Sequence, residues 1–209
     1  MAKRKILKHF HTVNKHRFNV FKNCCKLGIP FHGLFHDLSK YSFKEFWPST
    51  KYYRGVGSPI LNERKVSTYS SIWNHHTNRN KHHFEYWIDL CNNYIFIRPM
   101  PFKYSLEYVA DVISASKTYN GKSFKPDMPL NYFLARKHTY LMHSATKEFV
   151  EILFKEFSLN GFKNLKKKNT KKIYEDCLIK HPNIEVYNLL NKNNELEITK
   201  EIPDFIKNK

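Results

Sequence analysis

The sequence predicts an all-α protein whose helical body ends near residue 160. Three observations support this fold class. Apolar residues recur at helical spacing along the body, no alternation of apolar and polar residues persists there for five or more positions, and 6 glycines in 209 residues are too few for a turn-dense β fold. We expect one helical domain over residues 1–160, followed by a Lys- and Asn-rich C-terminal appendage over 161–209.

The spacing of apolar residues, together with capping and helix-breaking residues at the ends, predicts six helices. Ser42 is expected to cap the second helix, with Glu45 three residues later as its partner in a capping box. A third helix is expected to resume after a break at 78–80 and to continue through the segment NRNKHHFEYWIDL. A stretch over 183–200 has no firm assignment. The expected helices cover residues 3–27, 43–53, 63–76, 104–119, 144–157 and 171–180.

Composition limits the classes of function. The 36 Lys and Arg outnumber the 18 Asp and Glu, giving a net charge of +18, while 16% aromatic residues exclude a disordered basic tail. A dense lysine run over 163–172 is either a solvated surface or a patch that attracts phosphates. The four cysteines form no C-x-x-C pair, and we find neither a signal peptide nor an apolar run of about 20 residues. We therefore expect a cytoplasmic protein with reduced thiols and no membrane contact.

The chemistry is expected to centre on His36 and Asp37. Imidazole and carboxylate are both metal ligands, and a carboxylate can bridge two ions. Leu34, Phe35 and Leu38 surround the pair, so its charge is expected to be buried and to require a partner or a metal. The pair is expected to lie on one helical turn.

Other candidate ligands lie far from this pair in the chain. His16 is on the first expected helix, and Asp111 is a carboxylate inside an apolar helical stripe. Four histidines also fall within nine residues. Helical spacing pairs His75 with His82 and His76 with His83, whereas a break at the asparagines also allows His76 with His82, the pair we favour. The remaining candidates, as ligands or as residues beside the ligands, are His75, His83 and Glu85.

The order His16, His36-Asp37, Asp111 resembles the HD-domain superfamily of metal-dependent phosphohydrolases, and Lys40 in HDLSK matches the lysine of its H-D-I-G-K form. The histidines at 75–83 resemble those of the binuclear members. More narrowly, HDLSKYS, W-x-HH-x-x-x-N-x-HH-x-EYW and the later AD are similar to an uncharacterised HD-like family of bacterial and phage genomes, over about residues 10–150. The resemblance implies an HD-like helical bundle.

The resemblance also implies a phosphohydrolase or phosphodiesterase that acts on a nucleotide or related phosphate ester through metal-activated water. Asp37 and Lys40 would be catalytic, and Lys40 would contact the substrate phosphate. Apart from the resemblance, the loop Arg54-Gly55-x-Gly57-Ser58 could line a phosphate pocket with its backbone N–H groups, which makes Arg54 a second candidate phosphate contact. One or two divalent ions are expected, with Mn, Fe, Zn, Ni, Co and Mg all open. Two alternatives remain: a mixed-valent di-iron oxygenase on the same scaffold, and a non-enzymatic nucleic-acid binder that uses the basic tail. The implied partner is a small anionic substrate, and the oligomeric state stays open.

Overall fold

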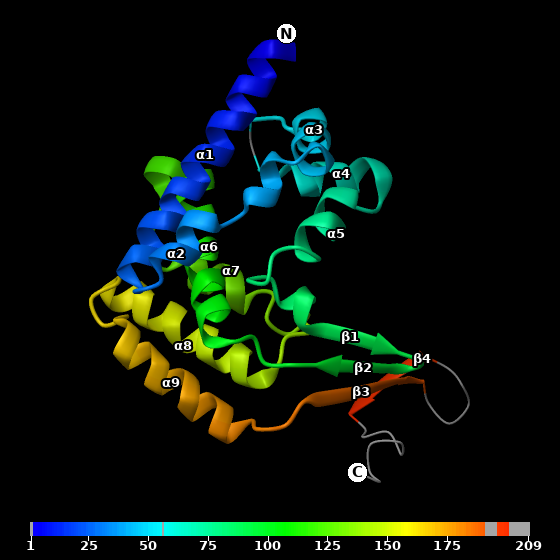
Figure 1. Cartoon of the computed structure of the whole chain (residues 1–209), viewed down its shortest axis with the longest axis vertical. Helices are drawn as coiled ribbons and strands as arrows, with labels where there is room; N and C mark the ends of the chain where they lie inside the picture. The colour runs from blue at the N-terminus through cyan, green and yellow to red at the C-terminus, as the bar shows by residue number, and fades with distance from the viewer. Residues whose placement is uncertain (1, 56, 191–195, 201–209) are drawn as a thin grey trace.

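The computed structural model describes residues 2–55, 57–190 and 196–200, and most of them are helical. Figure 1 shows a larger group of helices and a smaller group, α3–α5, beside it. The helices are α1 (Ala2–Lys26), α2 (Pro30–Phe35), α3 (Phe43–Tyr52), α4 (Pro59–Ser67), α5 (Ser71–Thr77), α6 (Phe102–Asn120), α7 (Met128–Leu134), α8 (Ser144–Asn160) and α9 (Lys167–Lys180), with 3-10 turns η1 (Leu38–Tyr41), η2 (Phe84–Trp87) and η3 (Gly121–Ser123).

Helices α1 and α6 form the centre of the larger group and pack along each other. Their shared core consists of apolar side chains that are fully buried, such as Val20 from α1 and Ile113 from α6. Buried amide and hydroxyl groups also join the two helices, because Asn23 Nδ2 donates to Ser114 Oγ at 2.8 Å. This pairing fixes α1 and α6 in register, which matters because each carries a candidate ligand.

Helix α2 lies directly against α1 because residue 33 is a glycine. A Cβ atom at Gly33 would lie 2.8 Å from Phe21 Cα and 2.7 Å from Cys24 Cβ, closer than carbon atoms approach each other. Only a residue without a side chain therefore allows this contact. The close packing sets the position of the chain that follows α2, which contains His36 and Asp37.

A small antiparallel sheet lies beside the helices (Figure 1), with strands in the order β1 (Ile88–Cys91), β2 (Tyr94–Ile97), β3 (Glu185–Leu190) and β4 (Leu196–Lys200). The expectation of a body without strands, with a helix running through residue 90, is therefore wrong. Each strand of the first hairpin has only four residues, which is too short for an alternation to be recognised. Asn92, at φ 55°, forms the turn between them.

The main helices α1, α6 and α8 confirm the prediction of long amphipathic helices. Two of the predicted helices are wrong in part. The helix expected over 63–76 is interrupted at Thr68, which has φ 57°. The break expected at 78–80 is present, but the helix does not resume after it, since turns, η2 and β1 follow. Helix α7 was not expected. The predicted capping box is absent: Ser42 precedes α3, but its side chain makes no capping hydrogen bond, and the Glu45 side chain contacts the histidines of α5 instead.

The chain beyond residue 160 packs onto the body. Leu165, Tyr174 and Cys177 are buried in the main core, and Tyr174 donates a hydrogen bond from its hydroxyl to the Met100 carbonyl at 2.8 Å. Strand β3 pairs with β2. Among the described residues, no helix is both long enough and apolar enough to cross a lipid bilayer.

Candidate metal centre

His36 and Asp37 lie in the short link between α2 and η1, not on a helical turn as the sequence suggested. Asp37 has φ 52° and ψ 32°, a left-handed conformation that aspartate tolerates better than most residues. This sharp change of direction brings both side chains inward, and each residue is only 1% exposed. Buried groups of this polarity need compensation by hydrogen bonds or by a cation.

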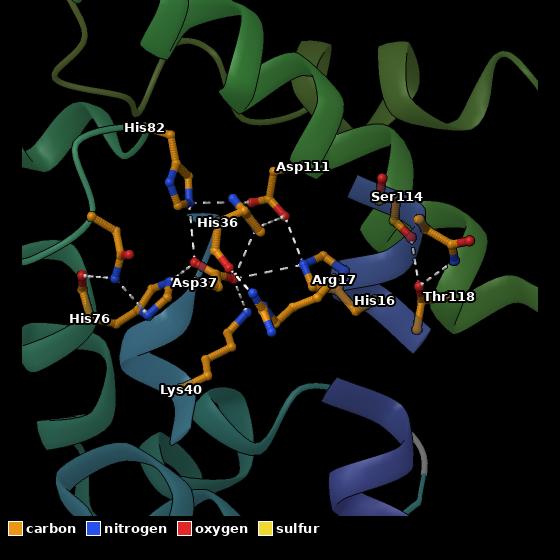
Figure 2. A network of polar contacts seen from close by, with 12 residues as sticks. His16, Arg17, His36, Asp37, Lys40, His76, His82, Asp111, Ser114 and Thr118 are labelled. Carbon is orange, nitrogen blue, oxygen red and sulfur yellow. Dashed lines mark hydrogen bonds and ion pairs between the residues drawn. The ribbon is translucent and has the colours of Figure 1, made fainter. Parts of the chain in front are cut away.

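His16, His36, Asp37 and Asp111 converge on one point (Figure 2). His36 Nε2 lies 3.0 Å from Asp37 Oδ2 and 3.5 Å from Asp111 Oδ1. His16 Nε2 lies 2.9 Å from Asp111 Oδ1 and 3.8 Å from Asp37 Oδ2. The fold therefore brings these four residues together, although they lie on α1, on α6 and after α2.

The second oxygen of Asp37 faces a different set of histidines. Asp37 Oδ1 lies 3.3 Å from His76 Nε2 and 3.5 Å from His82 Nε2. His83 belongs to the same group of possible ligands, in which all ligand atoms lie within 4.8 Å of one another. Asp37 therefore stands between two sets of nitrogen atoms, with one oxygen toward each, as a carboxylate that bridges two ions would.

Two buried glutamates, which the sequence analysis did not assign to the site, hold the outer nitrogens of these rings. Glu107 Oε1 lies 2.9 Å from His36 Nδ1 and 3.2 Å from His82 Nδ1. Glu45 Oε2 lies 2.9 Å from His76 Nδ1. An ionised carboxylate only accepts hydrogen bonds, so each Nδ1 carries a proton, and each Nε2 faces the centre as the ring atom that can bind a metal.

The inward atoms have no hydrogen bond to satisfy them. The buried side-chain atoms that lack a hydrogen-bond partner include Nε2 of His16, His36, His82 and His83 and Oδ1 of Asp37. These atoms approach one another, but without the alignment of a hydrogen bond. Native proteins leave few such groups. A set of nitrogen and oxygen atoms aimed at shared points is what a divalent cation requires, so the residues present fit a metal site.

The charges of the cluster depend strongly on one another. Burial alone would raise the pKa of Asp37, but His36 and Lys40 together hold it well below its usual range. Burial likewise opposes the charge on His36, yet Asp37, Asp111 and Glu107 raise its pKa well above the ordinary value. In contrast, burial and the neighbouring His82 lower the pKa of His83, so its ring is neutral. The carboxylates are therefore ionised and prepared for a cation.

Lys40 extends beside the cluster, and its Nζ donates to Asp37 Oδ2 at 2.5 Å. The Lys40 side chain is 28% exposed, that of Asp111 17% and that of His16 10%, whereas the ligand candidates on the other side are almost completely buried. Solvent therefore reaches the centre from the side of Lys40 and Asp111.

The remaining predicted residues lie around the centre. His75 contacts the second oxygen of Glu45, at 2.8 Å, so that Glu45 holds two adjacent histidines. Burial raises the pKa of Glu85 to about 7, and its carboxyl borders a separate hollow beside Trp73. Arg54 is exposed in the loop after α3, and none of the described contacts joins it to the cluster.

The sequence contained a signal for one of the missed glutamates. Glu107 precedes Asp111 by four residues, so both lie on the same face of α6, and both are carboxylates within an apolar helical stripe. A carboxylate at Glu107 is therefore as costly to bury without a compensating cation as the one at Asp111. Glu45 had no comparable signal, because its position three residues after Ser42 suits a capping box.

The fold and the cluster together define a mostly helical protein with a buried histidine–carboxylate centre that could hold metal. The chain belongs to a protein family described as a family of unknown function (DUF5662), which it matches over residues 5–156. All the candidate ligands lie within this matched region. Neither the curated proteins nor the solved structures include a match to this chain.

Proposed function

We propose that the protein is an HD-like, metal-dependent phosphohydrolase or phosphodiesterase that acts on a nucleotide or a related phosphate ester. The position of Asp37 carries this proposal: one oxygen faces His16 and His36, and the other faces His76 and His82. The Nε2 atoms of His16, His36 and His82 have no hydrogen-bond partner. The resemblance of HDLSK and the later AD to the HD superfamily supports the same reading, with α1, α2, α5 and α6 as the HD-like bundle.

The residues of the chain divide the work of such a site. Asp37, His16, His36 and Asp111 would hold one ion, and Asp37, His76 and His82, with His83 next to them, would hold a second. Divalent ions supply an activated water molecule and neutralise charge on a phosphoryl group. Glu107 and Glu45 keep the histidine rings in the tautomer that binds metal and prevent the rings from rotating.

Lys40 is the group that would meet the substrate. Its ammonium lies at the exposed edge of the cluster and is paired with Asp37. A bound cation would compete for the same carboxylate oxygen, and the flexible lysine could then turn toward an anion at the entrance. A fixed positive charge beside a phosphoryl group stabilises the charge that develops during transfer. The four cysteines are free, which suits a cytoplasmic location.

The test combines metal analysis with turnover of bis(p-nitrophenyl) phosphate. Protein purified without chelator is expected to contain up to two divalent ions per chain and to hydrolyse this diester. Asp37→Ala is expected to lose both the metal and the activity while retaining its helical circular dichroism. Glu151→Gln, which changes a carboxylate paired with Lys137 away from the centre, serves as the control and should behave as the parent chain.

Three results would contradict the proposal. Full metal content in Asp37→Ala would remove Asp37 from the ligands. Metal-loaded protein that hydrolyses no phosphate ester would exclude the activity. Two irons with a mixed-valent spectroscopic signal and no hydrolysis would instead favour a di-iron oxygenase on the same residues.

A further inference from the structure

The positive charge of the chain is concentrated in its first 83 residues, which carry most of the candidate ligands. Residues 2–83 contain 16 Lys and Arg but only 3 acidic residues, so they carry +13 of the total +18. Those three acids, Asp37, Glu45 and Glu63, are all buried and bound by neighbouring side chains. Within the described parts of this segment, 2–55 and 57–83, no carboxylate is exposed.

The rest of the chain is different. Residues 84–209 contain 20 basic and 15 acidic residues, a net charge of only +5. A general preference for lysine would raise the basic count everywhere, but it would not remove exposed acids from one region alone. The lysine run at 163–172, which the sequence left open as either a solvated surface or a patch that attracts phosphates, belongs to this more balanced part of the chain.

Aromatic rings extend across this basic surface from the entrance of the centre. The Arg17 guanidinium donates to the His36 carbonyl at 2.8 Å and lies 5.0 Å from the centre of the Tyr41 ring. Phe10 contacts Tyr41 and Phe46 with ring centres 5.9 and 6.2 Å apart. Phe46 in turn contacts Trp47 at 5.9 Å. We call this continuous set, Phe10, Arg17, Tyr41, Phe46 and Trp47, the aromatic band.

The aromatic band starts at the site and reaches solvent. Arg17 and Tyr41 directly follow His16 and Lys40 in the chain, so one end of the band adjoins the exposed edge of the cluster. At the other end, Phe10 is 45% and Trp47 48% exposed, although both are large apolar side chains. Exposed aromatic rings among lysines and arginines match the requirements of a flexible polyanion whose flat bases stack while its phosphates meet the cations.

We propose that this face binds single-stranded nucleic acid and delivers its phosphodiester to the metal centre. The proposal names the substrate class of the phosphoesterase and rests on that function for its catalytic half only. A single strand is favoured over a duplex for two reasons. Its bases are free to stack on Phe10 and Trp47, and its flexible backbone can enter a centre whose ligands are nearly buried, whereas a duplex is a stiff rod with its bases enclosed.

The binding test uses the full chain in chelator, so that it does not depend on metal or turnover. The probe is a fluorescein-labelled oligothymidine of about 16 nucleotides, followed by anisotropy across a range of salt concentrations. Binding is expected to weaken linearly on a double-logarithmic plot of affinity against salt, with a slope of about −0.7 for each phosphate contact. Trp47→Ala is expected to weaken binding about tenfold through the loss of one stacked base.

Two charge-reversal variants of equal net charge distinguish binding at this surface from attraction of the oligonucleotide by the overall positive charge. One variant carries Glu at four exposed lysines of the proposed face, Lys3, Lys8, Lys44 and Lys51. The control carries Glu at four exposed lysines of the C-terminal run, Lys163, Lys166, Lys168 and Lys172, and therefore has the same net charge. We expect the first to lose more than tenfold in affinity and to have a shallower salt slope, while the second stays within about threefold of the parent.

Several results would overturn the inference. Equal losses in the two variants would reduce the effect to net charge, and tighter binding to a duplex of equal length would exclude a single-strand site. Flotation with phosphatidylserine vesicles, without any binding of the oligonucleotide, would assign the face to an anionic membrane instead. Hydrolysis of bis(p-nitrophenyl) phosphate is read separately, so failure of oligonucleotide binding and failure of the proposed phosphoesterase activity are distinguishable.

Discussion

Glu107 and His36 are joined by a buried contact of 2.9 Å between Oε1 and Nδ1, and the same oxygen lies 3.2 Å from Nδ1 of His82. One carboxylate therefore orients a histidine from each of the two candidate ion sites. Its other oxygen lies 2.9 Å from Nδ1 of His32. These three contacts make Glu107 the residue that couples the two halves of the centre, although it has no atom aimed at either.

Replacing Glu107 with Gln is expected to weaken metal binding by about 10- to 100-fold without unfolding the protein, because the neutral amide has only one accepting oxygen for the three ring nitrogens that Glu107 contacts. Competition with a fluorescent chelator measures the affinity, and circular dichroism checks the fold. Glu45→Gln should affect only the ion next to His76. Loss of affinity for only one of the two ions in Glu107→Gln would show that Glu107 does not couple the two sites.

The two sets of histidines predict how many ions each variant retains. His76→Ala combined with His82→Ala removes two nitrogens facing Asp37 Oδ1 but leaves His16, His36 and Asp111 in place. Metal content measured by elemental analysis should therefore fall from two ions toward one. A double variant that still holds two ions would contradict the assignment of this pair as ligands.

Single replacement of His83 distinguishes a ligand from a neighbour of the ligands. Its ring contacts those of His76 and His82, and its Nε2 is buried without a hydrogen-bond partner. The His83 ring therefore lies beside the proposed site of the second ion. As a ligand, its loss lowers affinity for the second ion by at least tenfold in the same chelator competition. An unchanged affinity together with weaker binding of inorganic phosphate would instead place His83 next to the substrate.

The long helices and some of the candidate ligands could be predicted, because the sequence patterns that indicate them lie within a few helical turns. The stripes of α1, α6 and α8 repeat over several turns, and Asp111 is conspicuous as a charge within one of them. The strands could not be predicted, since β2 has four residues and depends on pairing with β3, far along the chain. The role of Glu45 depends on a contact with α5 across a loop, whereas its sequence position indicated a helix cap.

Gly33 offers a test of how the fold positions the centre. Gly33→Ala places a methyl group within 2.8 Å of Phe21 Cα and must push α2 away from α1. Overpacking of this kind costs about 1–3 kcal/mol, measurable by urea denaturation of the metal-free chain. Because His36 and Asp37 directly follow α2, metal affinity should fall as well. A loss of stability with unchanged metal affinity would show that the link after α2 holds its position independently.

Metal binding is also expected to depend on pH, and the direction follows from the charges of the cluster. Asp37, Asp111 and Glu107 hold the pKa of His36 above its ordinary value, and Asp37 and Glu45 raise that of His76, although burial alone would lower both. Both rings therefore hold a second proton, on the Nε2 that faces the centre, more tightly than a free imidazole does, and a cation must displace it. The carboxylates of Asp37 and Asp111 have lowered pKa values and stay ionised.

The affinity for metal should therefore rise with pH above about 6.5, the ordinary pKa of imidazole, and should level off only above the raised pKa values of His36 and His76. Titration calorimetry in buffers of different ionisation enthalpy counts the protons released, and we expect at least one per chain at pH 7. An affinity that is constant through this range, with no proton release, would exclude these histidines as the groups that meet the metal.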